Sequence, residues 1–135
     1  MSALTPAEVL ERRREALRNQ DTDGFVALFS PDGVIELPFA APDMPSRLEG
    51  QQAIRDFSRR VAASPLRIDD LEPLAVYQTE DPEVIIVELV TYGTLTGTGR
   101  TLAGTSIQVF RIRDGKIVLF RDYFNPLGFE ELLRG

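Results

Sequence analysis

Asp122 is the residue of this 135-residue chain whose type and surroundings point most directly to chemistry. In a strand, its side chain would point to the same face as Phe120 and Phe124. A dry carboxylate has a raised pKa and is seldom kept on an apolar face unless something pairs with it or uses it. We therefore predict a general acid/base at the floor of a pocket. Two alternatives stay open: exposure at the strand end, or an ion pair with an arginine such as Arg55, Arg111 or Arg121.

Gln108 is the second candidate, because it alternates with Phe110 and Ile112 in an expected strand. If the turn at 113–115 is a three-residue loop with Gly115 in the left-handed region, Gln108 shares a face with Asp122. A two-residue loop would reverse that parity. In the pocket the amide could donate to a substrate carbonyl or orient the substrate; otherwise it satisfies backbone groups.

The composition excludes several kinds of active site. The chain has no cysteine and no histidine, which removes thiol nucleophiles, serine–histidine triads and the commonest metal ligands. Its formal charge of −6 argues against nucleic acid as a partner. The acidic residues between 69 and 83 lack the spacing of a calcium loop, so we expect no metal. We expect no cofactor either, because proton transfer in a dry pocket does not need one.

Other polar residues have more ordinary interpretations. The three arginines at 12–14 fan around a helix among glutamates, so we expect a solvated face. The glycine-rich segment 96–100 joins two strands and is expected to form a hairpin rather than a phosphate cradle. Glu88 is expected to pair with Arg111 or Arg121 on the face opposite the pocket. Tyr92 is a possible hydroxyl donor to the ligand.

The elements that must position these residues begin with helices. Thr5-Pro6-Ala7-Glu8 predicts a capped helix that runs to about Asn19, with Val9, Leu10, Ala16 and Leu17 on one face. A short helix capped by Asp21 is expected to extend to Phe29, and a third helix follows Gly50 and ends at Ser64-Pro65. Segment 30–33 is expected to be a turn, 34–37 a short strand, and 39–49 a loop.

The rest of the chain is rich in β-branched residues and predicts four long strands, at 66–78, 84–95, 104–113 and 116–124. A last helical turn would follow Asn125-Pro126 through Phe129, Leu132 and Leu133. Helices followed by a meander of strands predict an α+β fold, with helices on one face of a curved antiparallel sheet. The last strands are apolar on both faces, which favours a homodimer through the other face.

Chain length and the absence of targeting or membrane-spanning segments indicate the number of domains and the location of the protein. A chain of this size predicts a single domain over residues 1–135. No apolar run approaches the ~20 residues of a membrane span. No signal peptide is visible after Met1, so we expect a cytoplasmic protein without membrane partners.

The segments 110–117 and 120–126, together with Leu28-Phe29-Ser30-Pro31-Asp32-Gly33, Pro38-Phe39 and Leu48-Glu49-Gly50, resemble the SnoaL-like branch of the ketosteroid isomerase-like superfamily, which shares the nuclear transport factor two fold. The resemblance spans nearly the whole chain. It implies a cone-shaped sheet wrapped around N-terminal helices, an apolar internal cavity, and a homodimer. It says little about the reaction, because this fold hosts many chemistries.

The resemblance can be carried over only position by position. Steroid isomerases place their catalytic aspartate before the proline that is here Pro38, and this chain has Leu37 there. Their second acid falls where Gln108 stands, and their donor tyrosine falls near Arg13. Asp122 resembles the last-strand acid of epoxide hydrolase-like, polyketide cyclase and phenazine-biosynthesis members. The Asn-Pro after that strand looks most like the phenazine branch, which commonly adds a histidine that this chain lacks.

Three functional hypotheses follow. The first is a cofactor-independent enzyme for cyclisation, isomerisation, condensation or epoxide opening of an apolar small molecule, with Asp122 as acid/base and Gln108 polarising the substrate. The second is a module that binds such a ligand without converting it, and the third is a structural dimer with a filled interior. In the first two, the cavity would be lined by seven hydrophobic or aromatic side chains: Phe29, Leu37, Phe57, Tyr92, Phe110, Phe120 and Phe124.

Overall fold

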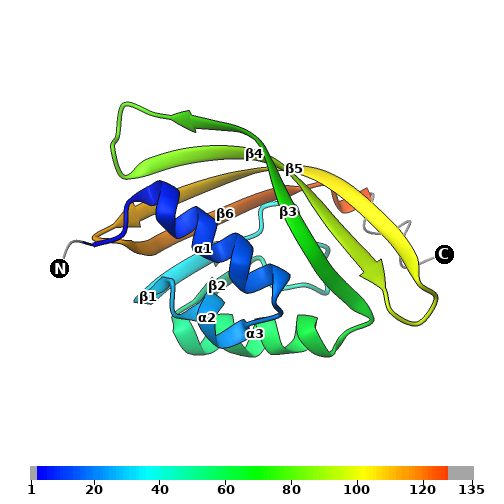
Figure 1. The fold of residues 1–135 in the computed structure, drawn as a ribbon. Helices are drawn as coiled ribbons and strands as arrows, with labels where there is room; N and C mark the ends of the chain where they lie inside the picture. Colours follow the sequence, from blue (N-terminus) through cyan, green and yellow to red (C-terminus); the bar gives the residue numbers. More distant parts are fainter. Residues whose placement is uncertain (1–2, 128–135) are drawn as a thin grey trace.

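A computed structural model describes residues 3–127 as three helices and a six-stranded sheet (Figure 1). The helices are α1 (Pro6–Arg18), α2 (Thr22–Val26) and α3 (Gln51–Ala63). The strands are β1 (Phe29–Glu36), β2 (Arg47–Glu49), β3 (Leu66–Gln78), β4 (Val84–Leu95), β5 (Arg100–Arg113) and β6 (Lys116–Phe124). The long strands curve over α1, and α2 and α3 lie at the open side, which gives the expected α+β cone.

The helix α1 begins and ends where its sequence signals predict. The Thr5 side chain accepts from the Glu8 N–H at 3.2 Å, and Glu8 accepts from the Thr5 N–H at 3.0 Å, which completes a capping box. Asn19 is the C-cap. The helix packs across β3, so one of its faces is turned toward the interior of the sheet.

The sheet has the strand order β2-β1-β6-β5-β4-β3. Neighbours from β6 to β3 are antiparallel, as the meander predicts, but β1 pairs with β6 in parallel. The sheet is therefore mixed rather than wholly antiparallel. A parallel neighbour needs a long connection rather than a hairpin, and here most of the chain separates β1 from β6.

Three local predictions were wrong. The short helix α2 ends at Val26, so Phe29 begins β1 instead. Segment 30–33, expected to be a turn, lies inside β1 as an irregularity of its register with β6. Segment 39–49 is not entirely loop, because Arg47–Glu49 forms β2 and pairs with the end of β1. Turn-forming residues therefore mark a bulge here rather than a chain reversal.

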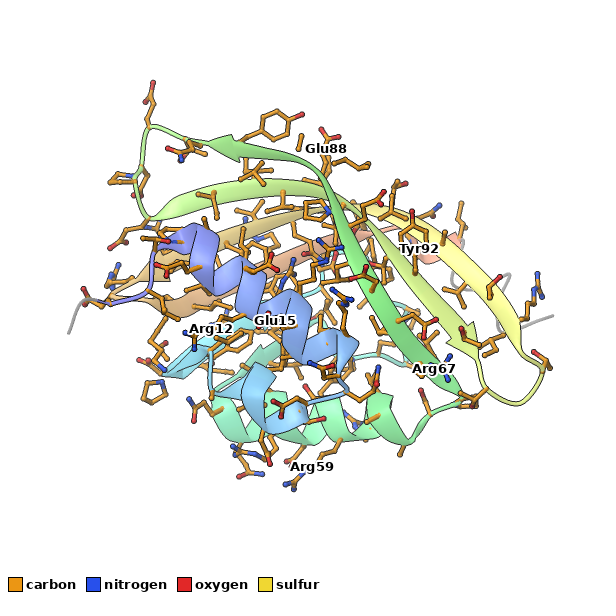
Figure 2. All side chains as sticks on the ribbon, viewed as in Figure 1. Arg12, Glu15, Arg59, Arg67, Glu88 and Tyr92 are labelled. Carbon is orange, nitrogen blue, oxygen red and sulfur yellow. The ribbon has the colours of Figure 1, made fainter. Side chains whose placement is uncertain are left out.

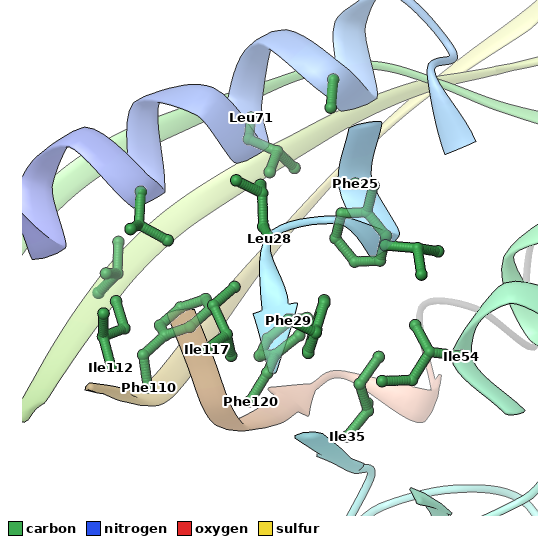
Figure 3. Packing of buried hydrophobic residues seen from close by; sticks show 14 of the residues in the cluster. Phe25, Leu28, Phe29, Ile35, Ile54, Leu71, Phe110, Ile112, Ile117 and Phe120 are labelled. Carbon is green, nitrogen blue, oxygen red and sulfur yellow. The ribbon is translucent and has the colours of Figure 1, made fainter. Parts of the chain in front are cut away.

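The interior lies between the helices and one face of the sheet, which we call the inner face (Figure 3). It contains Phe25, Phe29, Ile54, Phe110 and Phe120, which come from both helices and strands. The opposite, outer face leaves large hydrophobic side chains exposed, among them Ile107 at 45% and Tyr77 at 47%. One face is thus covered by this chain itself and the other is not.

Within residues 3–127, no helix is both long and apolar enough to cross a lipid bilayer. The expected last helical turn through Phe129, Leu132 and Leu133 falls outside the described residues.

Candidate active site

Gln108 and Asp122 lie directly opposite each other on the neighbouring strands β5 and β6. Directly paired residues of antiparallel strands point to the same face, here the inner face, which they share with Phe110 and Phe120. The predicted proximity of the amide and the carboxylate is therefore present.

The reason for this pairing differs from the one expected. The β5–β6 turn is a two-residue loop, since Arg113 pairs with Lys116 and both Asp114 and Gly115 have positive φ angles, 51° and 75°. That loop alone would put Asp122 on the opposite face. However, Ile112 pairs with Ile117 whereas Arg111 pairs with Leu119, so Val118 is an extra residue in β6. This bulge restores the parity and turns Asp122 inward.

Arg13 completes the site from α1. Its side chain is buried, with 4% of the residue exposed, and Nη1 donates a hydrogen bond to Oε1 of Gln108, which is equally buried. The guanidinium carbon lies 4.7 Å from the ring centroid of Phe110 and 5.5 Å from that of Phe120. These rings are themselves stacked, with centroids 4.7 Å apart. The cation is thus held by aromatic faces and by the glutamine oxygen.

Arg13, Gln108 and Asp122 form a trio whose two charged members are largely shielded from water. Burial raises the pKa of Asp122 from 3.8 to about 6, although Gln108 and the positive charge of Arg13 oppose the rise. Burial lowers the pKa of Arg13 to about 10, and Asp122 opposes that fall. At pH 7 Arg13 is therefore charged, and Asp122 titrates close to the range in which a general acid/base works best.

Two atoms of the trio are buried without a hydrogen-bond partner: Nε of Arg13 and Oδ1 of Asp122. Within residues 3–127, they are the only buried side-chain nitrogen or oxygen atoms without a hydrogen-bond partner. Buried polar groups are nearly always satisfied, so a donor and an acceptor without partners in one small group of side chains point to a bound water or ligand.

The ion pairs first considered for Asp122 do not form. Arg121 donates to Glu36 at 3.0 and 3.2 Å on the outer face. Arg111 bonds Asp81 and Glu83, each at 3.0 Å. Arg55 lies 3.7 Å from Asp23. The cation that acts on Asp122 is Arg13 instead, and among the described residues no ion pair joins Asp122 to an arginine.

Two further predictions were also wrong. Arg13 does not lie on a solvated face: it follows Val9 by four residues and precedes Ala16 by three, and both of these are buried. That spacing was the signal that could have identified it. Glu88 pairs with neither Arg111 nor Arg121 but accepts from the Tyr77 hydroxyl at 2.8 Å.

The predicted lining residues occupy different places. Phe29, Leu37, Phe110 and Phe120 are buried in the core, and Phe57 and Phe124 pack against it half-buried. Tyr92 is not brought to the trio, since it pairs with Ala103, in register with the outer-face residues of β4 and β5, and its hydroxyl lies 3.4 Å from Glu72. Figure 2 shows Tyr92 and Glu88 on the side of the sheet away from α1.

Two surface pockets in the described part of the chain lie away from the trio. One of about 580 Å³ lies at the end of β6 and is lined largely from the outer face, by Leu74, Glu88 and Ile107 among others. The other, of about 470 Å³, lies near Asp69 and Tyr92. Neither is lined by Arg13, Gln108 or Asp122, so an apolar cavity beside Asp122 stays a prediction. Residues 3–127 contain no group of three or more side chains placed to ligate a metal ion.

Comparison with known proteins agrees with this fold. An uncharacterized PhzA/B-like protein of Pseudomonas aeruginosa is 38% identical over 132 residues, which cover 95% of this chain and 89% of that protein. The crystal structure of a proposed isomerase from Bacillus subtilis is 30% identical, with a TM-score of 0.88 over 96% of this chain and 92% of that one. The Δ5-3-ketosteroid isomerase of a Mycobacterium shares the fold, with a TM-score of 0.76, 22% identity, and coverage of 93% and 97%. The SnoaL-like domain profile matches residues 10–120, and the chain therefore belongs to the SnoaL-like family.

Proposed function

We propose that this protein is a small-molecule enzyme of the SnoaL-like type, which uses Asp122 for proton transfer in an isomerisation, cyclisation or epoxide-opening reaction. The observation that carries the proposal is a carboxylic acid whose pKa is raised to about 6 and whose buried Oδ1 has no hydrogen-bond partner, within the electrostatic influence of the buried Arg13 guanidinium. A structural ion pair would have its partners hydrogen-bonded to each other, and these two are not.

The three residues support a simple division of labour. Ionised Asp122 takes a proton from the substrate and later returns it, a role that contributes about 10²–10⁴-fold. Arg13 stabilises the negative charge that develops on a substrate oxygen, since a preorganised cation in a dry site acts strongly on such charge. Gln108 is a positioning residue, because its oxygen holds Nη1 of Arg13. This differs from the direct polarisation of substrate first expected of Gln108.

The test is a reaction screen with enolisable ketones, polyketide-like esters and epoxides, followed by Asp122→Asn. We expect turnover of the active compound to fall at least about 100-fold, because the variant keeps the shape of the site and loses its proton acceptor. Asp70→Asn is the matched control, since Asp70 is a half-exposed carboxylate paired with Arg14 at 2.9 Å. Unchanged turnover in Asp122→Asn would remove Asp122 from the mechanism.

A non-catalytic binding module remains the alternative, because Leu37 occupies the position of the isomerase base and the chain has no histidine. In that case a ligand would bind at the trio and be recovered unchanged after long incubation, and Asp122→Asn would alter affinity only.

We also propose that two copies associate through the outer face. That face exposes large hydrophobic side chains, among them Ile107 and Tyr77. It also carries tyrosine–glutamate pairs such as Tyr77–Glu88, which can contact the equivalent pairs of a second copy across a two-fold axis. Sedimentation should show a dimer, and Ile107→Asp should give monomers. The control Arg59→Glu, on α3 away from that face (Figure 2), should leave the dimer intact. A monomeric wild-type protein at micromolar concentration would contradict this proposal.

A further inference from the structure

We infer that the group recognised at this site is an uncharged hydroxyl-type oxygen, as in an alcohol, phenol or enol, which accepts a hydrogen bond from Nε of Arg13 and donates one to Oδ1 of Asp122. The inference concerns the same residues as the proposed function and names the ligand chemistry that they select. It requires binding but no turnover.

Arg13 has one buried N–H without a partner that a ligand could satisfy. The guanidinium carbon lies within 4.7 and 5.5 Å of the centroids of the stacked rings of Phe110 and Phe120. The N–H groups of a guanidinium lie in its own plane, so its hydrogen bonds are made in that plane. Nη1 is engaged by Gln108, whereas the Nε–H is buried and has no acceptor. An acceptor atom that satisfies Nε must approach in the plane of the guanidinium.

Asp122 supplies the complementary requirement. Its Oδ1 is buried and has no donor, and at neutral pH a carboxylate oxygen can only accept. Asp122 lies directly across from Gln108, the residue that holds Arg13, so the two unpartnered atoms belong to one small group of side chains.

A hydroxyl group is the ligand chemistry that satisfies both atoms at once. Its oxygen accepts from Nε, and its proton is donated to Oδ1. A ketone or ether oxygen satisfies Arg13 but leaves Oδ1 without a donor. A carboxylate has no proton to donate and adds a second negative charge beside Asp122. The aromatic side chains around Arg13 favour an apolar body attached to the hydroxyl group.

The experiment compares phenol, toluene and benzoate, which have similar size and differ in the group presented. The readout is the side-chain Nε–H resonance of Arg13 in ¹⁵N–¹H NMR spectra at pH 7.5, where Asp122 is mostly ionised. Phenol should bind about tenfold more tightly than toluene, because one hydrogen bond to each charged partner is gained, and it should shift this resonance. Benzoate should bind no better than toluene.

Two variants separate the contributions of the trio. Arg13→Lys keeps the positive charge without an Nε–H, and Asp122→Leu removes the acceptor. In each, the preference for phenol over toluene should fall to about twofold or less. Arg14→Lys is the matched control, because Arg14 pairs with Asp70 outside the trio, and its preference should equal that of the wild-type protein. If Asp122→Leu does not fold, the Arg13→Lys variant and the wild-type titration still test the inference.

Equal affinity for phenol and toluene, tighter binding of benzoate, or an unmoved Nε–H resonance would each overturn the inference. These results are distinguishable from those that test the proposed function. Phenol binding that shifts Arg13, combined with turnover that does not depend on Asp122, would keep this inference and remove the acid/base role. Loss of both would leave the trio with a structural role.

Discussion

The sheet carries two groups of opposite charges whose chemistry is different. The inner trio, Arg13, Gln108 and Asp122, is held between α1 and the inner face and leaves two buried atoms unpartnered. The outer cluster, Asp81, Glu83, Arg111 and Arg113, lies at the start of β4 and the end of β5, and its ion pairs are direct, at 2.9 to 3.0 Å.

The two groups shift carboxylate pKa values in opposite directions. Hydrogen bonds from Arg113 and Arg111 lower the pKa of Glu83 to about 2, whereas burial raises the pKa of Asp122 to about 6. Both groups combine arginine with a carboxylate, and what differs is whether the cation and the anion are in contact and whether water reaches them. Direct pairing favours a charged carboxylate and a rigid surface, whereas separation in a dry interior produces a group ready to exchange a proton.

The substitution with the largest expected effect on stability is Arg13→Met. It keeps much of the side-chain volume but leaves the Gln108 oxygen without its donor and Asp122 without a nearby cation. A buried group left without its hydrogen-bond partner costs about 1–3 kcal/mol, more where a charge is involved, and Asp122 also loses its opposing charge, so we expect a loss of about 3 kcal/mol or more in urea unfolding at pH 8. Arg14→Met, which removes a half-exposed partner of Asp70, should cost much less, because solvent screens this surface pair. Equal losses in both variants would break the contrast between interior and surface.

Asp122→Asn should have a smaller effect of the opposite sign. The pKa of Asp122 is raised on folding, so ionisation above about pH 6 penalises the folded state. The rise from 3.8 to about 6 corresponds to about 3 kcal/mol, the upper limit of the gain expected for the variant at pH 8. This gain should shrink as the pH falls and vanish below about pH 4. Unfolding curves from pH 3 to pH 8 measure it, and a variant less stable than the wild type at pH 8 would contradict the penalty.

Glu83→Gln should show the reverse dependence on pH. The pKa of Glu83 is lowered on folding, so its ionised form stabilises the folded state above pH 4.5, and that contribution is lost as the pH falls toward 2. The variant should be less stable than the wild type at pH 7 and equal to it near pH 2. The difference should be smaller than that for Asp122→Asn, because solvent screens these surface charges. Thermal unfolding at both pH values provides the measurement. A variant as stable as the wild type at pH 7 would show that the ion pairs of Glu83 contribute nothing measurable to the stability of the fold.

The effect of salt on stability should also differ between the two groups, and it is the smallest effect that we expect. Raising the salt concentration to 1 M shortens the screening length to about 3 Å. We expect the stability difference between wild type and Glu83→Gln at pH 7 to diminish, while that between wild type and Asp122→Asn at pH 8 stays nearly constant. Equal salt dependence would mean that water reaches the inner trio.

Much of the fold followed from local patterns in the sequence. The bounds of β4 and β6 are those predicted, because β-branched runs end at clear turn residues, and the capping box located the start of α1. The strand β2 and the parallel pairing of β1 with β6 were missed. Both depend on contacts between segments far apart in the chain, and periodicity within one segment carries no information about them.

The site was predicted in part for a similar reason. Asp122 and Gln108 stand out because polar side chains interrupt apolar strands. Arg13 was concealed by its neighbours Arg12 and Arg14, which form a basic run that resembles an exposed surface. What distinguishes it is its position on the same helical face as Val9 and Ala16, which only helical geometry reveals. Its pairing with Gln108, 95 residues away, could not be predicted from the sequence pattern.

The bulge at Val118 has a consequence for how this hairpin tolerates insertions and deletions. The loop and the bulge together contain one more residue than a regular two-residue hairpin. The total number of residues between the paired strands decides whether the Asp122 side chain faces α1. A homologue could therefore move the surplus residue from the strand into the loop and still present the carboxylate to the arginine. A homologue that lost Val118 without a compensating insertion in the loop would instead present that carboxylate to the outer face.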